Sequence, residues 1–276
     1  MIRLPVIKTV FGAYYYLWEE RLYLWQLTLP PLVVLAILNT LVQWGTVSSI
    51  DIGSKIASID IYRSGWVAVL FYLAFFVNIW VWLSYSVAWH RAYLLRSENK
   101  DVLKAYSWNG RQVQFLWTTL KIFFLMFPAM YILSHFIILG VNGAINLGVN
   151  GALPIIFGMT ACLYVYARLL LWFPAVAIDQ TLNIWPLWQL SRKNGWRLAS
   201  VMVCTSLPLV MSGFLVGLVF QQLGFFDQSN QSLSVTLLGN LFLEFLSFIA
   251  LAASISALSF SYRYLLQNKN SPSGSI

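Results

Sequence analysis

Six long apolar stretches run through this chain, and they limit how it can fold more than any other feature. A helix needs about 20 mostly apolar residues to cross the hydrocarbon core of a bilayer. Stretches of at least that length lie near 23–46, 65–89, 114–139, 153–177, 199–223 and 235–261. Because a backbone in hydrocarbon must satisfy its own hydrogen bonds, the sequence predicts an all-α polytopic transmembrane helical bundle of about six spans.

Composition supports the same class. The 276 residues are 59% hydrophobic and only 9% charged, whereas soluble domains carry about 25% charged residues. The formal net charge of +8 is attributed to topology and to anionic lipid headgroups, so we expect no nucleic-acid partner. Cys162 and Cys204 fall inside apolar runs without metal-ligand spacing, and we expect no disulfide framework, metal or cofactor.

The distribution of lysine and arginine predicts the orientation. Thirteen of the seventeen basic residues lie on one side of the six spans: Arg3, Lys8, Arg21, Arg91, Arg96, Lys100, Lys104, Arg111, Arg192, Lys193, Arg197, Arg263 and Lys269. The opposite connections hold only Lys55 and Arg63. The positive-inside rule therefore places both termini in the cytoplasm. We assign residues 1–268 to a single integral membrane domain and residues 269–276 to a flexible cytoplasmic tail.

Three stretches beside the spans have amphipathic spacing, near 6–18, 102–117 and 185–196. In the third, two tryptophans accompany basic residues, which is typical of helices that lie among lipid headgroups. We take Arg192, Lys193, Arg197 and Arg91 as candidate lipid-headgroup contacts. The glycine- and asparagine-rich segment 140–152 favours an irregular hairpin loop, with a small re-entrant or helical piece as the alternative.

A weak threefold pattern divides the chain. Each odd-numbered span contains proline, namely Pro30 and Pro31, then Pro128, then Pro208. Each even-numbered span leads into a related string, WHRAYLLR, YARLLLW or SYRYLLQ, and Asn-Gly precedes spans three and five. The pattern predicts three units, each with an amphipathic leading helix, a kinked span, an outer turn and a returning span. Duplication and shared topological constraint both explain it.

Arg168 is the first of four candidate functional residues at membrane depth, since ionisable groups are rare there. It precedes an apolar run that contains Pro174. One interpretation is an arginine that snorkels or marks a bend in the helix. The other is a buried charge paired with Asp179, Glu19 or Glu20.

The other three candidates are Glu244, Asn240 and His135. Glu244 lies one turn after Asn240 in the sixth span, and His135 lies in the outer half of the third. A buried carboxylate needs a partner or a proton, so we expect Glu244 to meet a donor such as His135 or Asn240. Such a group is either a structural hydrogen bond between helices or a minimal element for proton or cation coupling.

No catalytic signature is present in the sequence. It lacks HExxH, a Walker-type loop and GxSxG. We therefore expect a non-enzymatic role in membrane organisation, with the lipid bilayer and other membrane proteins as partners. The alternative hypothesis is a small-solute or ion transporter or channel.

The strings WHRAYLLR and ARLLLWFPAVAID, followed by LSRKNGWRLAS, carry a resemblance. The chain resembles a broad family of uncharacterised bacterial inner-membrane proteins related to the membrane domain of some glycerophosphodiester phosphodiesterases. The resemblance covers nearly the whole chain and is most specific at Arg168, Pro174, Ala175, Asp179 and 193–197. It implies a six-span bundle with interfacial helices in the bacterial inner membrane. The phosphodiesterase catalytic domain has no counterpart in this chain, so that activity is not carried over.

Overall fold

The computed structural model describes residues 3–49, 65–96, 101–147, 152–180, 183–222 and 233–270. In these ranges the structure is almost all helix, with short turns between the helices and no strands. The helices are α1 (Val6–Glu19), α2 (Arg21–Ser49), α3 (Gly65–Leu95), α4 (Val102–Ala105), α5 (Gly110–Leu147), α6 (Ala152–Leu169), α7 (Trp172–Ala177), α8 (Ile184–Leu190), α9 (Gly195–Gln222) and α10 (Leu233–Asn270). Lys55, Arg63, Lys100 and residues 271–276 of the predicted tail lie outside these ranges.

The all-α polytopic fold is confirmed. Six helical segments are long and apolar enough to cross a membrane, formed by α2, α3, α5, α6 continued by α7, α9 and α10. Each coincides with one predicted span. The clearest difference is at the end of the chain, where α10 continues to Asn270 instead of ending near 261.

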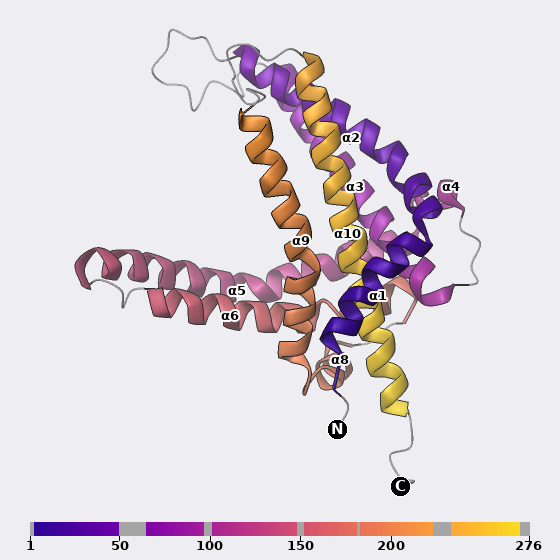
Figure 1. Cartoon of the computed structure of the whole chain (residues 1–276), viewed down its shortest axis with the longest axis vertical. Coiled ribbons are helices and arrows are strands. Elements are labelled where there is room, and N and C mark those ends of the chain that lie inside the picture. The colour runs from indigo at the N-terminus through magenta and orange to yellow at the C-terminus, as the bar shows by residue number, and fades with distance from the viewer. Residues whose placement is uncertain are drawn as a thin grey trace.

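The long helices fall into two groups. In Figure 1, α2, α3, α9 and α10 form a main bundle, whereas α5 and α6 lie side by side and project across it. The projecting pair is attached at one end, where Phe115 of α5 stacks on Phe173 of α7 with ring centroids 4.7 Å apart. Trp82 of α3 meets Phe115 edge-on at 5.9 Å. Beyond this attachment, large apolar side chains such as Phe124 and Phe157 are exposed.

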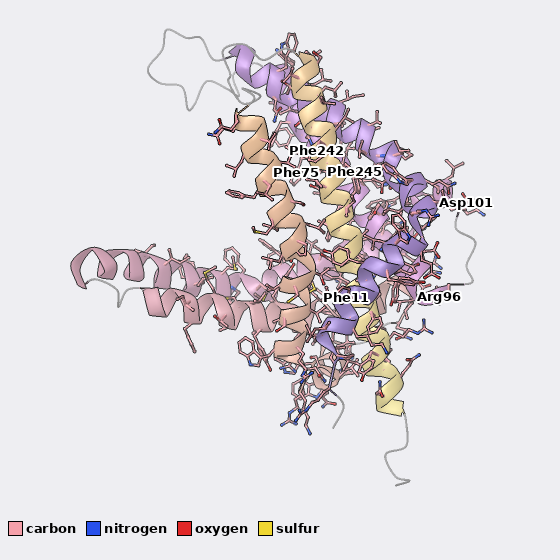
Figure 2. All side chains as sticks on the ribbon, in the orientation of Figure 1. Phe11, Phe75, Arg96, Asp101, Phe242 and Phe245 are labelled. Atoms are coloured by element: carbon pink, nitrogen blue, oxygen red, sulfur yellow. The ribbon has the colours of Figure 1, made fainter. Side chains whose placement is uncertain are left out.

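Helix α1 packs across α9 and α10. Its buried face carries Thr9, Ala13, Tyr16 and Leu17. The opposite face is also apolar, since Ile7, Phe11, Tyr15 and Trp18 recur at helical spacing and are exposed; Phe11 is labelled on α1 in Figure 2. One face of α1 therefore packs against the bundle, and the other is suited to contact with lipid.

The second and third amphipathic stretches are not single helices, which corrects that prediction. Helix α4 ends at Ala105 and α5 begins at Gly110, while α8 ends at Leu190 and α9 begins at Gly195. The backbone carbonyls of Asn109 and Asn194 accept bonds from Val113 and Leu198, so each asparagine begins a new helix. The Asn-Gly pairs thus mark the starts of two long helices.

The prediction of an irregular loop at 140–152 is wrong for residues 140–147, which continue α5 to Leu147; residues 148–151 lie outside the described ranges. Glycine costs about 1 kcal/mol in a helix interior. Extending an existing helix, however, needs no new nucleation, and proline is absent between Pro128 and Pro154.

Both ends of the described chain lie together. The Tyr264 hydroxyl of α10 donates to the backbone carbonyl of Arg3 at 3.4 Å. Figure 1 shows the start of α1 and the end of α10 at the same end of the molecule. We call this region the basic end: the starts of α1, α5 and α9, the ends of α3, α6 and α10, and α4, α7 and α8 between them. An even number of spans predicts this placement.

Candidate functional site

Arg168 is a buried cation at the end of α6, with 5% of its surface exposed. Its Nε donates to Ser191 Oγ at 2.9 Å, and a terminal nitrogen donates to the Trp188 carbonyl. Its other terminal nitrogen donates to the Tyr164 hydroxyl at 3.3 Å. The guanidinium also lies 3.5 Å from the centre of the Trp188 ring. These contacts fasten α8 to the end of α6.

The bend predicted at Arg168 is present, because α6 ends at Leu169 and α7 begins at Trp172. The alternative of a pair with Asp179, Glu19 or Glu20 is not what the structure shows. The described hydrogen-bond partners of Arg168 are neutral, and Asp179 binds other cations. The acceptor is instead the Trp188 carbonyl, in the last turn of α8. It can take the place of the expected carboxylate because the C-terminal end of a helix carries partial negative charge.

Asp179 joins three elements at the basic end. Its carboxylate accepts from Arg111 Nε of α5 at 2.9 and 3.0 Å and from Arg91 of α3 at 3.1 Å. Arg91 also donates to the carbonyl of Ala177, at the end of α7, at 2.9 Å. Asp179 has a φ of 60°, a left-handed conformation that Asp and Asn accept more readily than most residues. Asp179 therefore forms an ionic link between the projecting pair and the main bundle.

The charge of Asp179 follows from these bonds. Hydrogen bonds from the Arg111 side chain lower the pKa of Asp179, and Arg91 adds to this shift, while partial burial opposes it. A lowered pKa means that the carboxylate stabilises the fold above its unfolded pKa. That contribution is lost as the pH falls through the folded pKa. The link is therefore complete at neutral pH and is weakened only in strong acid.

The four candidate headgroup contacts separate into two kinds. Arg192 and Lys193 are exposed in the turn between α8 and α9. Arg197 instead donates to the Leu4 carbonyl at 2.8 Å, and the Arg91 side chain is turned inward to Ala177 and Asp179. Nitrogen atoms gather beside α8 in Figure 2. Only the first two side chains therefore have the exposure that a headgroup contact requires.

A polar seam lies between α2 and α10 inside the predicted membrane region. Asn39 Nδ2 donates to Glu244 Oε1 at 2.7 Å. One turn away, Asn240 Nδ2 donates to Thr40 Oγ1 at 2.9 Å and to Gln43 Oε1 at 3.2 Å. Glu244 lies about 17 Å along the helix from Leu233, so a core about 30 Å thick that began at Leu233 would have Glu244 near its middle.

Glu244 also borders a cavity of about 360 Å³ between α2, α3 and α10. Asn78, Ser247 and Ser254 supply the other polar groups, and Leu35, Trp82 and Phe248 are among the apolar ones. One carboxylate oxygen is thus bonded to Asn39 at the edge of a mostly apolar hollow that opens to the surface of the bundle. The hollow can hold one small polar group beside the carboxylate.

His135 does not meet Glu244, so the expected pairing is wrong. His135 is exposed on α5 beyond Pro128, and its ring lies 4.5 Å from that of Tyr131. Glu244 takes its donor from α2 instead. The direction of the projecting pair explains the difference, because α5, which carries His135, projects away from the main bundle that contains α10.

Two buried hydrogen bonds between α3 and α10 were not anticipated from the sequence. Trp89 Nε1 donates to Ser256 Oγ at 2.8 Å, and His90 Nδ1 lies 2.7 Å from Ser259 Oγ. Asn39 as the partner of Glu244 was also missed. The serines of α10 were the only sequence signal for the first two bonds, and this signal was weak because serine in an apolar helix is also common as a small packing residue.

These features define a polytopic integral membrane protein with ionic links at the basic end and a polar seam within the main bundle. Comparison with known proteins adds no narrower class. Neither a protein-family model nor a curated protein or solved structure matches the chain. The resemblance to the phosphodiesterase-associated membrane domains stays a prediction.

Proposed function

We propose that this chain is a non-enzymatic protein of the bacterial inner membrane that organises anionic lipid at the cytoplasmic surface and provides a membrane-embedded surface for other proteins. The observation that carries the proposal is the exposed surface around α8. Trp185 is 64% exposed and Trp196 is 56% exposed, and the exposed Arg192 and Lys193 lie between them in sequence. Indole rings favour the membrane interface, and cations favour anionic headgroups.

The orientation belongs to the same proposal. The meeting of Tyr264 with Arg3 supports placing both ends on one side, and the basic residues around α8 support placing that side in the cytoplasm. In that arrangement the exposed stripe of α1, which carries Phe11 and Trp18, faces lipid beside the main bundle.

Lipid retention by the purified full chain tests this function. A cation near an anionic surface contributes about 1 kcal/mol, so Arg192→Gln with Lys193→Gln, which removes two cations, is expected to reduce retained phosphatidylglycerol about thirtyfold at limiting lipid. Native mass spectrometry of protein extracted from mixed phosphatidylglycerol and phosphatidylethanolamine membranes measures the ratio. The charge-matched control carries Lys8→Gln with Arg263→Gln. Equal losses in both double variants would attribute retention to net charge and reject a surface formed by α8.

Transport of a small solute or ion is a second candidate, favoured by the cavity that Glu244 borders. Ionisable groups at membrane depth commonly belong to ion or proton pathways. The absence of His135 from the cavity lining weakens the version in which both residues act together. A transport role requires that Glu244 change its charge or partner during a cycle.

Substituting Glu244 by glutamine separates the two functions. The amide oxygen still accepts from Asn39, so thermal unfolding of the variant is expected to remain within about 0.5 kcal/mol of the wild type. Under the proposed function, lipid retention is also unchanged, and proteoliposomes containing either protein show the same background cation flux. A flux that the wild type supports and the folded variant lacks would establish transport. A large loss of stability would show instead that the carboxylate charge is required for folding.

A further inference from the structure

The hollow beside Glu244 has the dimensions of a small-molecule site. Its lining on α10 runs from Glu244 past Phe248 to Ser254, and Asn78 and Trp82 line it from α3. Because Ser254 lies ten residues after Glu244, the lining follows α10 for about 15 Å. The volume of about 360 Å³ falls within the range of about 300 to 1,000 Å³ that is common for ligand sites.

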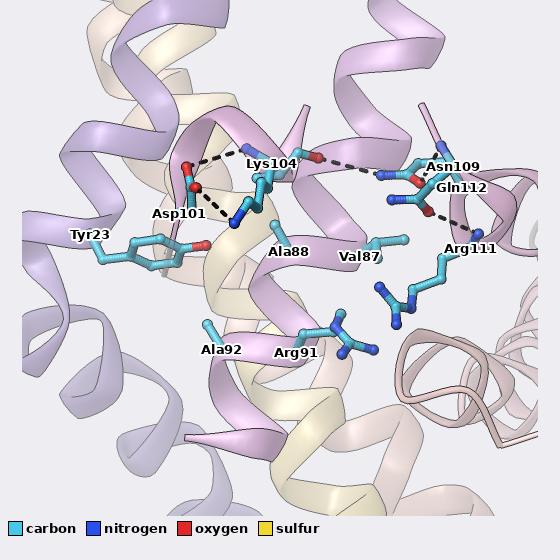
Figure 3. Close-up of a pocket in the computed structure, with 11 residues that line it drawn as sticks. Tyr23, Val87, Ala88, Arg91, Ala92, Asp101, Lys104, Asn109, Arg111 and Gln112 are labelled. Carbon is cyan, nitrogen blue, oxygen red and sulfur yellow. Dashed lines mark hydrogen bonds and ion pairs between the residues drawn. The ribbon is translucent and has the colours of Figure 1, made fainter. Parts of the chain in front are cut away.

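Glu244 has no cationic partner among the described residues. Its carboxylate receives one hydrogen bond there, from Asn39 Nδ2 at 2.7 Å. The helices that border the hollow hold no lysine or arginine in the stretches that flank it, 22–49, 65–90 and 233–262. Figure 3 shows the opposite case in a second cavity, at the basic end, where the Asp101 carboxylate lies 3.5 Å from the Lys104 amine. Since a charged carboxylate in an apolar setting is costly without a cation, a cation from outside the protein would complete the site at Glu244.

The other polar side chains of the hollow offer acceptors. Ser247 Oγ donates to the Leu243 carbonyl of its own helix at 2.9 Å. Asn78 Nδ2 likewise donates to the Ala74 carbonyl at 3.0 Å. Each donor group is thus bound within its own helix, while the serine oxygen and the asparagine Oδ1 can still accept. Trp82 adds an aromatic ring, and the faces of such rings attract cations. The lining therefore favours a ligand that is positively charged and donates hydrogen bonds.

We propose that this hollow binds a lipophilic amine, with its ammonium group on Glu244 and its apolar body along Phe248 and Leu251. An ammonium and a carboxylate form charge-assisted hydrogen bonds, which are among the stronger ones in proteins. A metal ion is a poorer match, because it needs more oxygen ligands than this mostly apolar lining supplies. A lipophilic amine partitions into lipid and reaches the hollow where it opens at the surface of the bundle. The inference goes beyond the proposed lipid surface around α8, and it concerns binding rather than transport.

Equilibrium dialysis of the full-length protein in detergent tests the site with three probes of one shape: 1-adamantanamine, 1-adamantanol and 1-adamantanecarboxylate. Protein-free micelles measure the partition of each probe into detergent. The wild type is expected to bind the amine about ten times more tightly than the alcohol, because only the amine adds a positive charge to its hydrogen bonds. The carboxylate is expected to bind no more than it does to protein-free micelles, since its charge repels that of Glu244.

Three variants locate the bound amine. Glu244→Gln is expected to weaken amine binding about tenfold and to leave alcohol binding nearly unchanged, because the amide keeps an acceptor but loses the charge. Glu19→Gln makes the same chemical change at an exposed position of α1 and is expected to bind the amine as the wild type does. Ser247→Leu places a larger side chain in the hollow from an exposed position. It is expected to weaken binding of the amine and the alcohol alike, about fivefold.

Two results would overturn the proposal directly. One is a wild type that binds the amine no more tightly than the alcohol, and the other is a Glu244→Gln protein that binds the amine as tightly as Glu19→Gln. Should Glu244→Gln fail to fold, Ser247→Leu decides the question. A folded Ser247→Leu protein that binds the amine as tightly as the wild type would reject the hollow as the site. Lipid retention at Arg192 and Lys193 is measured separately, so a failure here leaves the proposed function standing.

Discussion

Replacing Arg168 by alanine is expected to release α8 from the end of α6 and to lower the free energy of unfolding by about 3 kcal/mol. The loss combines hydrogen bonds to Ser191 and the Trp188 carbonyl with the stacking of the guanidinium on the Trp188 ring. It is partly offset, since the variant no longer buries a charge. Thermal unfolding in detergent measures the loss of stability, and the change in tryptophan fluorescence reports the release of α8.

Arg168→Lys and Arg192→Ala complete this comparison. Lysine retains the charge but lacks the planar fork, so it is expected to recover only part of the stability. Arg192 is exposed, and its removal is expected to leave unfolding nearly unchanged. An Arg168→Ala protein as stable as Arg192→Ala would show that the contacts between α6 and α8 do not hold this part of the structure together.

Substitution of Gly195 by alanine is expected to destabilise the protein by about 1 to 3 kcal/mol through overpacking. A Cβ at this position would lie 2.6 Å from Cζ and 2.9 Å from the hydroxyl oxygen of Tyr164. The Tyr164 ring also packs on Trp196, and its hydroxyl accepts from Arg168. The ring cannot move without disturbing those contacts. Equilibrium unfolding in mixed detergent micelles measures the change.

Gly110 offers a matched control, because it begins α5 as Gly195 begins α9. A Cβ on Gly110 meets no atom within 4 Å, so Gly110→Ala is expected to be neutral or slightly stabilising. In a Tyr164→Ala background, Gly195→Ala should cost far less, since the obstructing ring is gone. Equal effects of the two glycine substitutions would contradict the packing explanation.

The spans could be predicted because the membrane imposes one simple rule, a minimum length of apolar helix. The starts of α5 and α9 were marked by Asn109 and Asn194, whose residue types suit helix starts. The direction of α5 and α6 could not be predicted. It depends on long-range contacts of Phe115 with Phe173 and of Asp179 with Arg111. Similarly, the sequence indicated that Glu244 needs a donor but not that Asn39 supplies it.

The threefold pattern shows where sequence similarity stops being informative about contacts. Each predicted unit contains a short helix before a long helix that holds proline: α1 before α2, α4 before α5, and α8 before α9. The three related strings nevertheless place their arginines differently. Arg91 binds Asp179, Arg168 is buried against α8, and Arg263 is exposed. Duplication stays a hypothesis, because the shared order of helices is explained equally well by topology.

The crossing of the two groups of helices has a consequence for the surrounding lipid. At 1.5 Å per residue, α5 and α10 are each about 57 Å long, nearly twice the thickness of a hydrocarbon core of about 30 Å. Because they run in different directions, at least one of them crosses the bilayer at a steep tilt. Acyl chains beside the tilted helix must then shorten or splay to follow its exposed side chains. The protein would impose a local wedge of thinned bilayer, to which lipids with shorter tails adapt at the least elastic cost.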